Sequence, residues 1–211
     1  MAYKAIILDL DGVICFTDHY HYLAWKSLAD ELGVHFDEQI NNRLRGVSRM
    51  ASLEIVLEKY NKPLTEDEKD ALATRKNDRY RELLKNMSTA DLSEEVRQTL
   101  VALRHRGLKL AIGSSSRNAP TILSRLGLGG YFDAISDGNN ITRSKPDPDV
   151  FVKAAEMLGL PPSACLVVED AKAGIEAAIA GGFDSAAIGD AVKCGLATYS
   201  LSTFADLLKY T

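Results

Sequence analysis

The sequence has few cysteines and lacks a long apolar run, and each absence narrows the class of protein. The three cysteines, Cys15, Cys165 and Cys194, are scattered, so they form neither a disulfide framework nor the closely spaced pairs of a metal site. No apolar run approaches the roughly 18 residues of a membrane-spanning helix. Asp9 comes too early to leave room for the apolar segment of a signal peptide. We therefore expect a cytoplasmic protein with no membrane partner.

An excess of basic residues is also absent. The chain has 25 lysine and arginine residues against 29 aspartate and glutamate residues, a formal net charge of -4, which gives no reason to expect nucleic acid as a partner. Of the 211 residues, 46% are apolar, enough for one sizeable core, alone or with a small second domain. We expect a monomer that acts on a small molecule.

The first segment with side chains that could take part in a reaction is residues 5–12, Ala-Ile-Ile-Leu-Asp-Leu-Asp-Gly. Its four apolar residues predict a short strand buried on both faces, as in the centre of a parallel sheet. Residues two apart in a strand lie on the same side, so Asp9 and Asp11 would face a common volume. Two carboxylates that close repel each other unless a cation or a shared proton relieves them. Taken alone, the segment could also be a strand that ends in an ordinary Asp-Gly turn.

The segment from residue 16 to about residue 90 is predicted to be helical throughout. Apolar residues at helical spacing follow suitable caps, and no convincing strand interrupts them. We therefore predict a helical insert, residues 16–91, placed after the first strand. Its helices are predicted from Thr17 or Asp18 to Gly33, near 37–44, from Ser48 to about Tyr60, and from Thr65, which opens a capping box, to about Met87.

Three side chains of the helical insert could bind a ligand. His21 lies four residues before Trp25 on one helix face, and Lys76 falls on an apolar stripe. Arg49 lies in the first turn of a helix, where the helix dipole disfavours a cation unless an anion is bound. The alternatives are a buried histidine with satisfied hydrogen bonds, a lysine whose stem reaches solvent, and a solvated arginine.

From residue 92 onward, strands and helices alternate. This alternation predicts a parallel sheet with helices on both faces. We therefore predict an α/β fold whose Rossmann-like core comprises residues 1–15 plus 92–211. Strands are predicted at 108–113, 133–136, 165–168 and 185–188, and helices at 93–104, from about Pro120, at 148–159 and at 171–180.

The predicted strand ends carry the residues of a phosphoryl-transfer site. In parallel sheets, ligands bind beyond the carboxyl ends of the strands. Carboxylates gathered at one edge need a cation, and Mg²⁺ suits an all-oxygen set that partners a phosphate. Asp9 can then be the nucleophile and Asp11 the acid/base. The strand ends carry Asp9 and Asp11, residues 114–118, Lys145 on its loop, and Glu169 with Asp170.

Two other interpretations of the acidic pair fail. A calcium loop that began at Asp9 would need glycine at its sixth position and glutamate at its twelfth, but glycine is fourth and Tyr20 is twelfth. A dinucleotide-binding fold would need a glycine fingerprint after the first strand, and the sequence has none there.

These residues resemble the four motifs of the haloacid dehalogenase superfamily, in order and across the core. The motifs are residues 9–13 (Asp-Leu-Asp-Gly-Val), a serine after the second strand, Lys145-Pro146 and Glu169-Asp170. The resemblance implies a haloacid dehalogenase-like fold. The helical insert is similar to the cap of the β-phosphoglucomutase subfamily, through Thr17, Tyr20-His21, Ala24-Trp25-Lys26, residues 46–49 and Arg75-Lys76-Asn77, with residues 114–120 of the core.

The resemblance implies a role for each matched residue. Asp9 would carry an aspartyl-phosphate, and Asp11 would be the acid/base. Mg²⁺ would be held by Asp9, the backbone carbonyl of Asp11, and Asp170, with Glu169 nearby. The transferred phosphoryl group would be bound by Ser114 and Lys145, and a distal phosphate by Arg49, Ser116, Arg117 and Asn118. The cap would be connected to Asp11 and the sugar by Thr17, His21 and Lys76. The sugar cleft would be lined by Trp25, Gly46, Val47 and Ser48.

The implied reaction interconverts β-D-glucose 1-phosphate and D-glucose 6-phosphate through a β-glucose 1,6-bisphosphate intermediate. The sequence departs from the subfamily pattern at both hinges: Phe16 replaces an expected acid, and Glu94-Glu95 replaces an expected Pro-Gly. Two alternatives stay open. One is a cap-bearing sugar-phosphate or phosphoglycolate phosphatase of the same superfamily, and the other is a non-enzymatic phospho-accepting signalling module.

Overall fold

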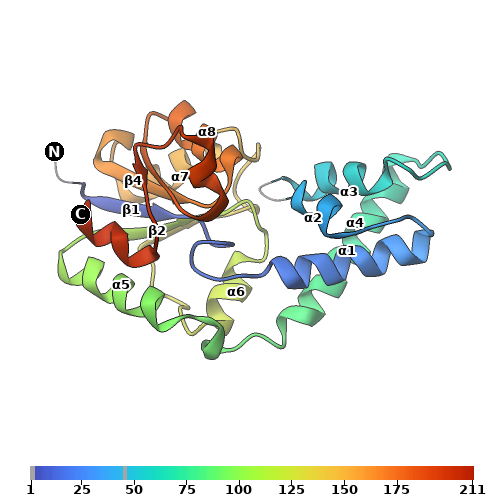
Figure 1. The fold of residues 1–211 in the computed structure, drawn as a ribbon, viewed down its shortest axis with the longest axis horizontal. Helices are drawn as coiled ribbons and strands as arrows, with labels where there is room; N and C mark the ends of the chain where they lie inside the picture. Colours follow the sequence, from blue (N-terminus) through green and yellow to red (C-terminus); the bar gives the residue numbers. More distant parts are fainter. Residues whose placement is uncertain (1–2, 45–46) are drawn as a thin grey trace.

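A parallel β-sheet forms the centre of one half of the molecule, and helices from the N-terminal part of the chain form the other half (Figure 1). Within residues 3–44 and 47–211, which the computed structural model describes, the sheet has six strands in the order β3-β2-β1-β4-β5-β6. They are β1 (Ala5–Leu8), β2 (Lys109–Gly113), β3 (Ala134–Ser136), β4 (Cys165–Glu169), β5 (Asp184–Ala187) and β6 (Tyr199–Ser200).

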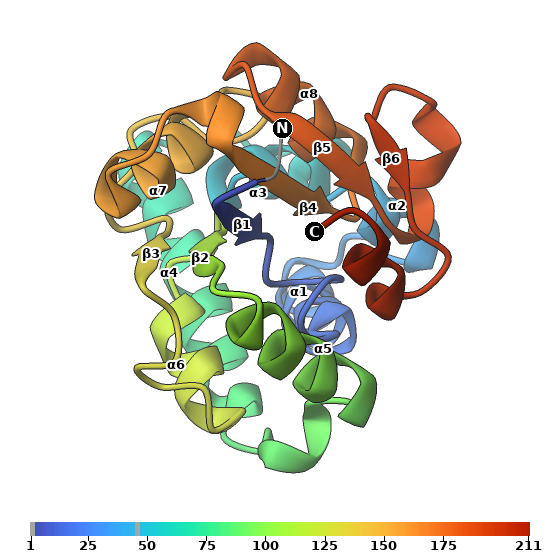
Figure 2. The ribbon, with the colours of Figure 1, turned by 90° about the vertical axis from the view of Figure 1, so that its left-hand side faces the viewer.

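Alternating side chains of β1 divide the core into two layers. Ile6 and Leu8 belong to one apolar cluster, and Ala5 and Ile7 belong to another on the opposite face. Figure 2 shows α5 on one side of the sheet and α7 and α8 on the other. The predicted Rossmann-like core is confirmed. Its helices are α5 (Glu94–His105) and α6 (Ala119–Arg125) in the first cluster, and α7 (Asp149–Leu158) and α8 (Lys172–Ala180) in the second.

The helical insert follows β1, as predicted. It has its own apolar cluster, which includes Trp25 and Leu53. Its base is continuous with the core, because Tyr80, Leu84 and Met87 belong to the same cluster as the first face of the sheet. Its helices are α1 (Asp18–Leu32), α2 (Glu38–Asn42), α3 (Arg49–Leu57) and α4 (Glu66–Leu84).

Helix boundaries agree with the predicted caps at some positions and differ at others. Thr65 opens α4 with a complete capping box, but the helix ends at Leu84 rather than near Met87. Pro148 precedes α7 instead of occupying its first position, and the carboxylate of Asp147 accepts the N–H of Asp149 at 3.1 Å. Short 3₁₀ helices are η1 (Thr89–Asp91), η2 (Pro162–Ala164), η3 (Gly189–Cys194) and η4 (Phe204–Lys209).

The state of the cysteines and the character of the helices can be compared with the expectations from the sequence. Cys15, Cys165 and Cys194 are free cysteines. Among the described residues, no helix has both the length and the apolar character needed to cross a bilayer.

Candidate active site

Asp9, Glu169 and Lys145 meet at the middle of the sheet edge. β1 and β4 are neighbours, with Leu8 paired to Val168, and the N–H of Asp9 donates to the carbonyl of Val168 at 3.0 Å. The ammonium of Lys145 donates to the carboxylate of Asp9 at 2.5 Å and also to that of Glu169. All three side chains are buried. The strand order reverses between β1 and β4, which is where open parallel sheets bind ligands.

Burial and several charged side chains act on the pKa of Asp9. Burial raises the pKa of Asp9 well above its usual value, against the lowering effect of Lys145. The carboxylates of Glu169, Asp170 and Asp11 raise this pKa further. Burial lowers the pKa of Lys145, but Asp9 and Glu169 outweigh it, so the net shift is upward and the amine stays charged. A further cation bound at this edge of the sheet would favour the ionised form of Asp9.

Gly12 brings Asp170 against the loop that carries the acidic pair. Its φ is 91°, in the left-handed region that favours glycine. A Cβ at Gly12 would lie 2.0 Å from a carboxylate oxygen of Asp170. Any larger residue would therefore displace Asp170 from this position.

The donor set at this edge suits a hard cation with few protein ligands. Among the described residues, no group of three or more His, Cys, Asp or Glu side chains is arranged to hold a metal ion. The implied set is smaller, with the carboxylates of Asp9 and Asp170 and the backbone carbonyl of Asp11. Mg²⁺ keeps several waters and takes one or two carboxylates, so this set fits Mg²⁺.

Gly174 of α8 leaves room for the side chain of Glu169, a requirement that was not predicted. A Cβ at Gly174 would lie 2.0 Å from the carboxylate carbon of Glu169. Glu169 has no free direction in which to move, because it is 1% exposed and is bonded to Lys145 and to the N–H of Ala171. A glycine inside a predicted helix was the available signal, since such a residue costs about 1 kcal/mol relative to alanine.

We expect Gly174→Ala to lower turnover about tenfold or more, although alanine is the better helix former by about 1 kcal/mol. The new methyl group would push Glu169 away from Lys145 and leave that ammonium less well oriented toward Asp9. Steady-state kinetics and thermal unfolding would be measured together. Gly129→Ala is the matched control, because a Cβ there meets nothing closer than 3.8 Å. Unchanged turnover in Gly174→Ala would contradict a role for the Glu169–Lys145 contact.

Asp11 receives its partner from the helical insert. The hydroxyl of Thr17 donates to the carboxylate of Asp11. Thr17 directly precedes α1 but makes no side-chain cap hydrogen bond, which corrects the predicted capping role. Burial raises the pKa of Asp11, while Thr17, Lys145 and Lys76 oppose the rise. A raised pKa suits a carboxyl group that carries a proton during part of a reaction.

Lys76 and His21 face each other inside the helical insert. The Nζ atom of Lys76 lies 2.9 Å from Nδ1 of His21 and sits over the rings of Trp25 and Tyr80 at 4.6 and 4.9 Å. The His21 ring stacks on Tyr80 with 4.0 Å between centroids. Burial, with help from Arg49, lowers the pKa of Lys76 to about 7. Burial and Lys76 lower the pKa of His21, so its neutral ring can accept a hydrogen bond from the amine.

This shift predicts how Lys76 affects stability. The folded pKa of about 7 lies below the ordinary 10.5, so between these values the unfolded chain binds more protons than the folded chain. Stability should therefore rise with pH in this window, by up to about 1.4 kcal/mol per unit from this group. Lys76→Met should have its largest stability advantage over the parent at pH 6 to 7, and a smaller one at pH 9.

Urea unfolding at several pH values would measure this difference. Lys85→Met is the control, since the Lys85 side chain is 60% exposed and pairs with Glu82. A Lys76→Met advantage that does not change between pH 7 and pH 9 would contradict the lowered pKa.

The loop after β2 forms the neighbouring part of the sheet edge. Ser114 is buried at the end of β2, and its hydroxyl accepts the N–H of Ser116 at 3.2 Å. The hydroxyl of Ser116 accepts the N–H of Asn118 at 3.2 Å. Gly138 allows a second loop to pack here, because a Cβ there would lie 2.5 Å from the carbonyl oxygen of Ser115.

Arg49 of α3 lies close to Arg117 of this loop. Burial and Arg117 lower the pKa of Arg49, while Asp78 raises it. Arg117 donates to the carbonyl of Gly138 at 3.1 Å, and Arg49 donates to the amide oxygen of Asn77 at 2.9 Å. Two guanidinium groups from the two halves of the molecule, each with a neutral acceptor, form a surrounding that favours an anion.

The residues predicted to line the sugar cleft are Trp25, Gly46, Val47 and Ser48. Trp25 is 2% exposed, lies in the apolar cluster of the helical insert and has the Nζ atom of Lys76 over its ring. Ser48 caps α3 by accepting the N–H of Ala51 at 3.3 Å, as expected. Val47 is partly exposed just before this cap. Gly46 lies outside the described residues.

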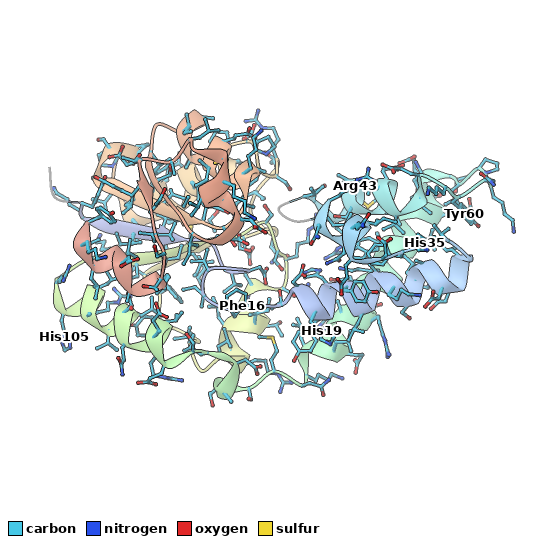
Figure 3. All side chains as sticks on the ribbon, viewed as in Figure 1. Phe16, His19, His35, Arg43, Tyr60 and His105 are labelled. Atoms are coloured by element: carbon cyan, nitrogen blue, oxygen red, sulfur yellow. The ribbon has the colours of Figure 1, made fainter. Side chains whose placement is uncertain are left out.

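Both departures at the hinges lie on the connections between the two halves. Phe16 is 79% exposed where the chain passes from the core into α1 (Figure 3). Glu94 and Glu95 form the first turn of α5, which Ser93 caps, and Glu95 accepts the N–H of Ala205 at 2.9 Å. The second connection is therefore fixed to the core by α5 itself.

Known proteins share this arrangement. β-Phosphoglucomutase of Bacillus subtilis strain 168 is 42% identical over 192 residues, which cover 88% of this chain and 83% of that protein. A phosphorylated carbohydrates phosphatase of Thermotoga maritima is 32% identical, over 86% of this chain and 82% of that protein. The crystal structure of β-phosphoglucomutase from Clostridium difficile matches with a TM-score of 0.91 at 33% identity, covering 98% of this chain and 93% of that chain.

The family model gives the same result. The family model described as "haloacid dehalogenase-like hydrolase" matches residues 3–182. This range includes the ends of β1, β2, β3 and β4 but not those of β5 and β6. The resemblance noted in the sequence is therefore confirmed at the level of the family. This chain belongs to the haloacid dehalogenase-like hydrolase family.

Proposed function

We propose that this protein is a β-phosphoglucomutase, which interconverts β-D-glucose 1-phosphate and D-glucose 6-phosphate. One observation carries the proposal: the site offers two separate cationic positions. Lys145 lies beside Asp9 in the core, and Arg49 of the helical insert lies near Arg117 of the core. A mutase that works through a bisphosphate must hold two phosphates at once, whereas hydrolysis of a monoester needs one position. The 42% identity to a β-phosphoglucomutase supports the same proposal.

In this proposal, Asp9 carries the phosphoryl group. Phosphorylated Asp9 passes the group to the 6-hydroxyl of β-glucose 1-phosphate, and Asp11 takes up the hydroxyl proton. The bisphosphate then turns around, Asp9 accepts the phosphoryl group from O1, and Asp11 returns the proton to O1. The raised pKa of Asp11 suits both directions of this proton transfer. Ser114 and Lys145 hold the phosphoryl group in transit.

The distal phosphate is proposed to bind Arg49, Ser116, Arg117 and Asn118. Thr17, His21 and Lys76 would connect the sugar and Asp11 to the helical insert, which we propose acts as a cap spanning residues 16–91. A closed cap would exclude water, which would otherwise hydrolyse the aspartyl-phosphate. The expectations of a cytoplasmic location and a monomer stay predictions.

Mg²⁺ is the proposed cofactor. Asp9, Asp170 and the carbonyl of Asp11 would hold it, with Glu169 nearby, and it would supply positive charge against the phosphate oxygens. The raised pKa of Asp9 supports this, because burial disfavours the charge of its carboxylate, Glu169, Asp170 and Asp11 add to the rise, and a bound cation would favour the ionised form.

A sugar-phosphate phosphatase is the second candidate, favoured by the 32% identity to a phosphorylated carbohydrates phosphatase. It would use Asp9, Asp11, Lys145 and Asp170 but would not need a second phosphate position. A phospho-accepting signalling module is disfavoured, since such a module has no use for a helical insert that brings Arg49 to the site.

A coupled assay separates these functions. The purified protein would be given β-glucose 1-phosphate, MgCl₂ and a trace of β-glucose 1,6-bisphosphate, and glucose 6-phosphate would be followed through its dehydrogenase. Inorganic phosphate would be measured in the same sample. Glucose 6-phosphate formed in large excess over phosphate is the expected result. Phosphate release without glucose 6-phosphate would establish the phosphatase, and no turnover of any phosphosugar would revive the signalling module.

A further inference from the structure

Asn77, a residue of α4, accepts hydrogen bonds from both the helical insert and the core through its side-chain oxygen. Its Oδ1 accepts a hydrogen bond from Nη2 of Arg49 at 2.9 Å and another from Nδ2 of Asn118 at 2.9 Å. Arg49 comes from α3 of the insert, and Asn118 directly precedes α6 of the core. One amide oxygen therefore uses both of its lone pairs on donors from the two halves of the molecule.

Neither donor makes the contact that its position usually favours. Asparagine is a preferred residue before a helix because its side chain caps the first turn, but Asn118 makes no side-chain cap hydrogen bond. Its amide extends to Asn77 instead. Arg49 is partly buried close to Arg117, where a guanidinium normally pairs with a carboxylate or a phosphate. The carboxylate of Asp78 acts on the pKa of Arg49, but the hydrogen bond of Arg49 to Asn77 goes to a neutral oxygen.

Both donors are among the residues that the proposed function assigns to the distal phosphate. The oxygen of Asn77 lies within hydrogen-bond distance of both, so it occupies a position that suits an oxygen of that phosphate. Asn77 belongs to a segment that carries the family resemblance, Arg75-Lys76-Asn77, but the resemblance gave it no role.

We propose that Asn77 is a positioning residue whose amide oxygen takes the place of a phosphate oxygen until the phosphosugar binds. It keeps Arg49 and Asn118 directed at one point and links α4 to the core. The arriving phosphate displaces Asn77, because a phosphate attracts the guanidinium of Arg49 through opposite charge as well as hydrogen bonds, whereas the amide oxygen offers only a dipole. The side chain must be neutral for this exchange, since a carboxylate would keep Arg49 for itself. The inference rests on the proposed distal phosphate position.

Asn77→Asp tests the exchange, because it keeps the shape of the side chain and adds a negative charge. Binding of inorganic phosphate to the full-length protein would be measured by calorimetry, and Arg49→Ala would identify the part of the binding that belongs to the distal position. We expect the dissociation constant of that part to rise at least about tenfold in Asn77→Asp. Asn77→Ala should weaken this binding less than Asn77→Asp does, because it removes the orienting oxygen but adds no competing charge.

Asn86→Asp is the matched control, since it places the same charge on an exposed position just beyond α4. In turnover, the KM for the phosphosugar should rise more in Asn77→Asp than kcat falls, a split that a general loss of structure would not produce. Equal weakening in Asn77→Ala and Asn77→Asp would overturn the inference, as would unchanged phosphate binding in Asn77→Asp or in Arg49→Ala. If the binding pattern is as expected but no glucose 6-phosphate forms, the mutase proposal fails and the exchange at Asn77 stands.

Discussion

Asp9→Asn is expected to lower turnover of β-glucose 1-phosphate by more than about a thousandfold, because an amide cannot form the acyl phosphate that the mechanism requires. The substitution keeps the shape of the side chain, so the fold should survive. Lys145 would still have Glu169 as a partner. The coupled assay for glucose 6-phosphate measures the loss, and incubation with acetyl phosphate followed by mass spectrometry would detect whether the protein takes up a phosphoryl group.

Asp30→Asn is the control for this prediction. Asp30 lies near the end of α1, is exposed and pairs with Lys26, so its loss should leave turnover unchanged. If Asp9→Asn retained more than a few per cent of the parent activity, or still became phosphorylated, the covalent mechanism would be wrong. Both readouts are needed, because activity alone does not identify the group that is phosphorylated.

Arg49→Ala should harm the mutase reaction far more than hydrolysis of a small phosphoester. A hydrogen bond to a charged group contributes roughly 1.5–3 kcal/mol, which corresponds to a loss of about 10- to 150-fold in kcat/KM for β-glucose 1-phosphate. Hydrolysis of p-nitrophenyl phosphate, which has one phosphate, should change less than about threefold. The comparison is internal to each variant and therefore does not depend on how much of the protein is active.

Arg75→Ala is the matched control for Arg49→Ala. Arg75 also belongs to the helical insert, but it is 57% exposed and pairs with Glu31 on the surface. Its removal should affect both reactions equally and slightly. Equal losses of the two activities in Arg49→Ala would mean that this arginine does not hold a second phosphate, and the phosphatase would become the better proposal.

The parts of the fold that follow from periodicity could be predicted. Ala5–Leu8 is apolar on both faces and forms the predicted central strand, while helical spacing before residue 90 predicts the insert. β6 was missed, because the two residues Tyr199–Ser200 are too few to show any period. Helix ends differed by a few residues where packing, rather than capping, decides the last turn, as at Leu84 of α4.

The site was predictable where a residue follows a strand or matches a motif, and not where it depends on contacts across the chain. Asp9, Lys145 and Glu169 come together because topology alone brings their strand ends and loop to one edge. The hydroxyl of Thr17 could equally have capped α1, and only the folded structure shows that it donates to Asp11. The contacts of Asn77 could not be predicted from the sequence, because its partners lie 28 and 41 residues away.

The apolar base shared by the helical insert and the core limits how far the site can be uncovered. Tyr80 and Leu84 are fully buried in the cluster that also packs against the sheet. Exposing such side chains costs roughly 1.5–3 kcal/mol each, so lifting both away from the sheet would be restricted to between about one molecule in 150 and about one in 25,000. In the proposed function, we therefore expect substrate exchange to involve a tilt about this anchored base rather than full separation of the insert from the sheet.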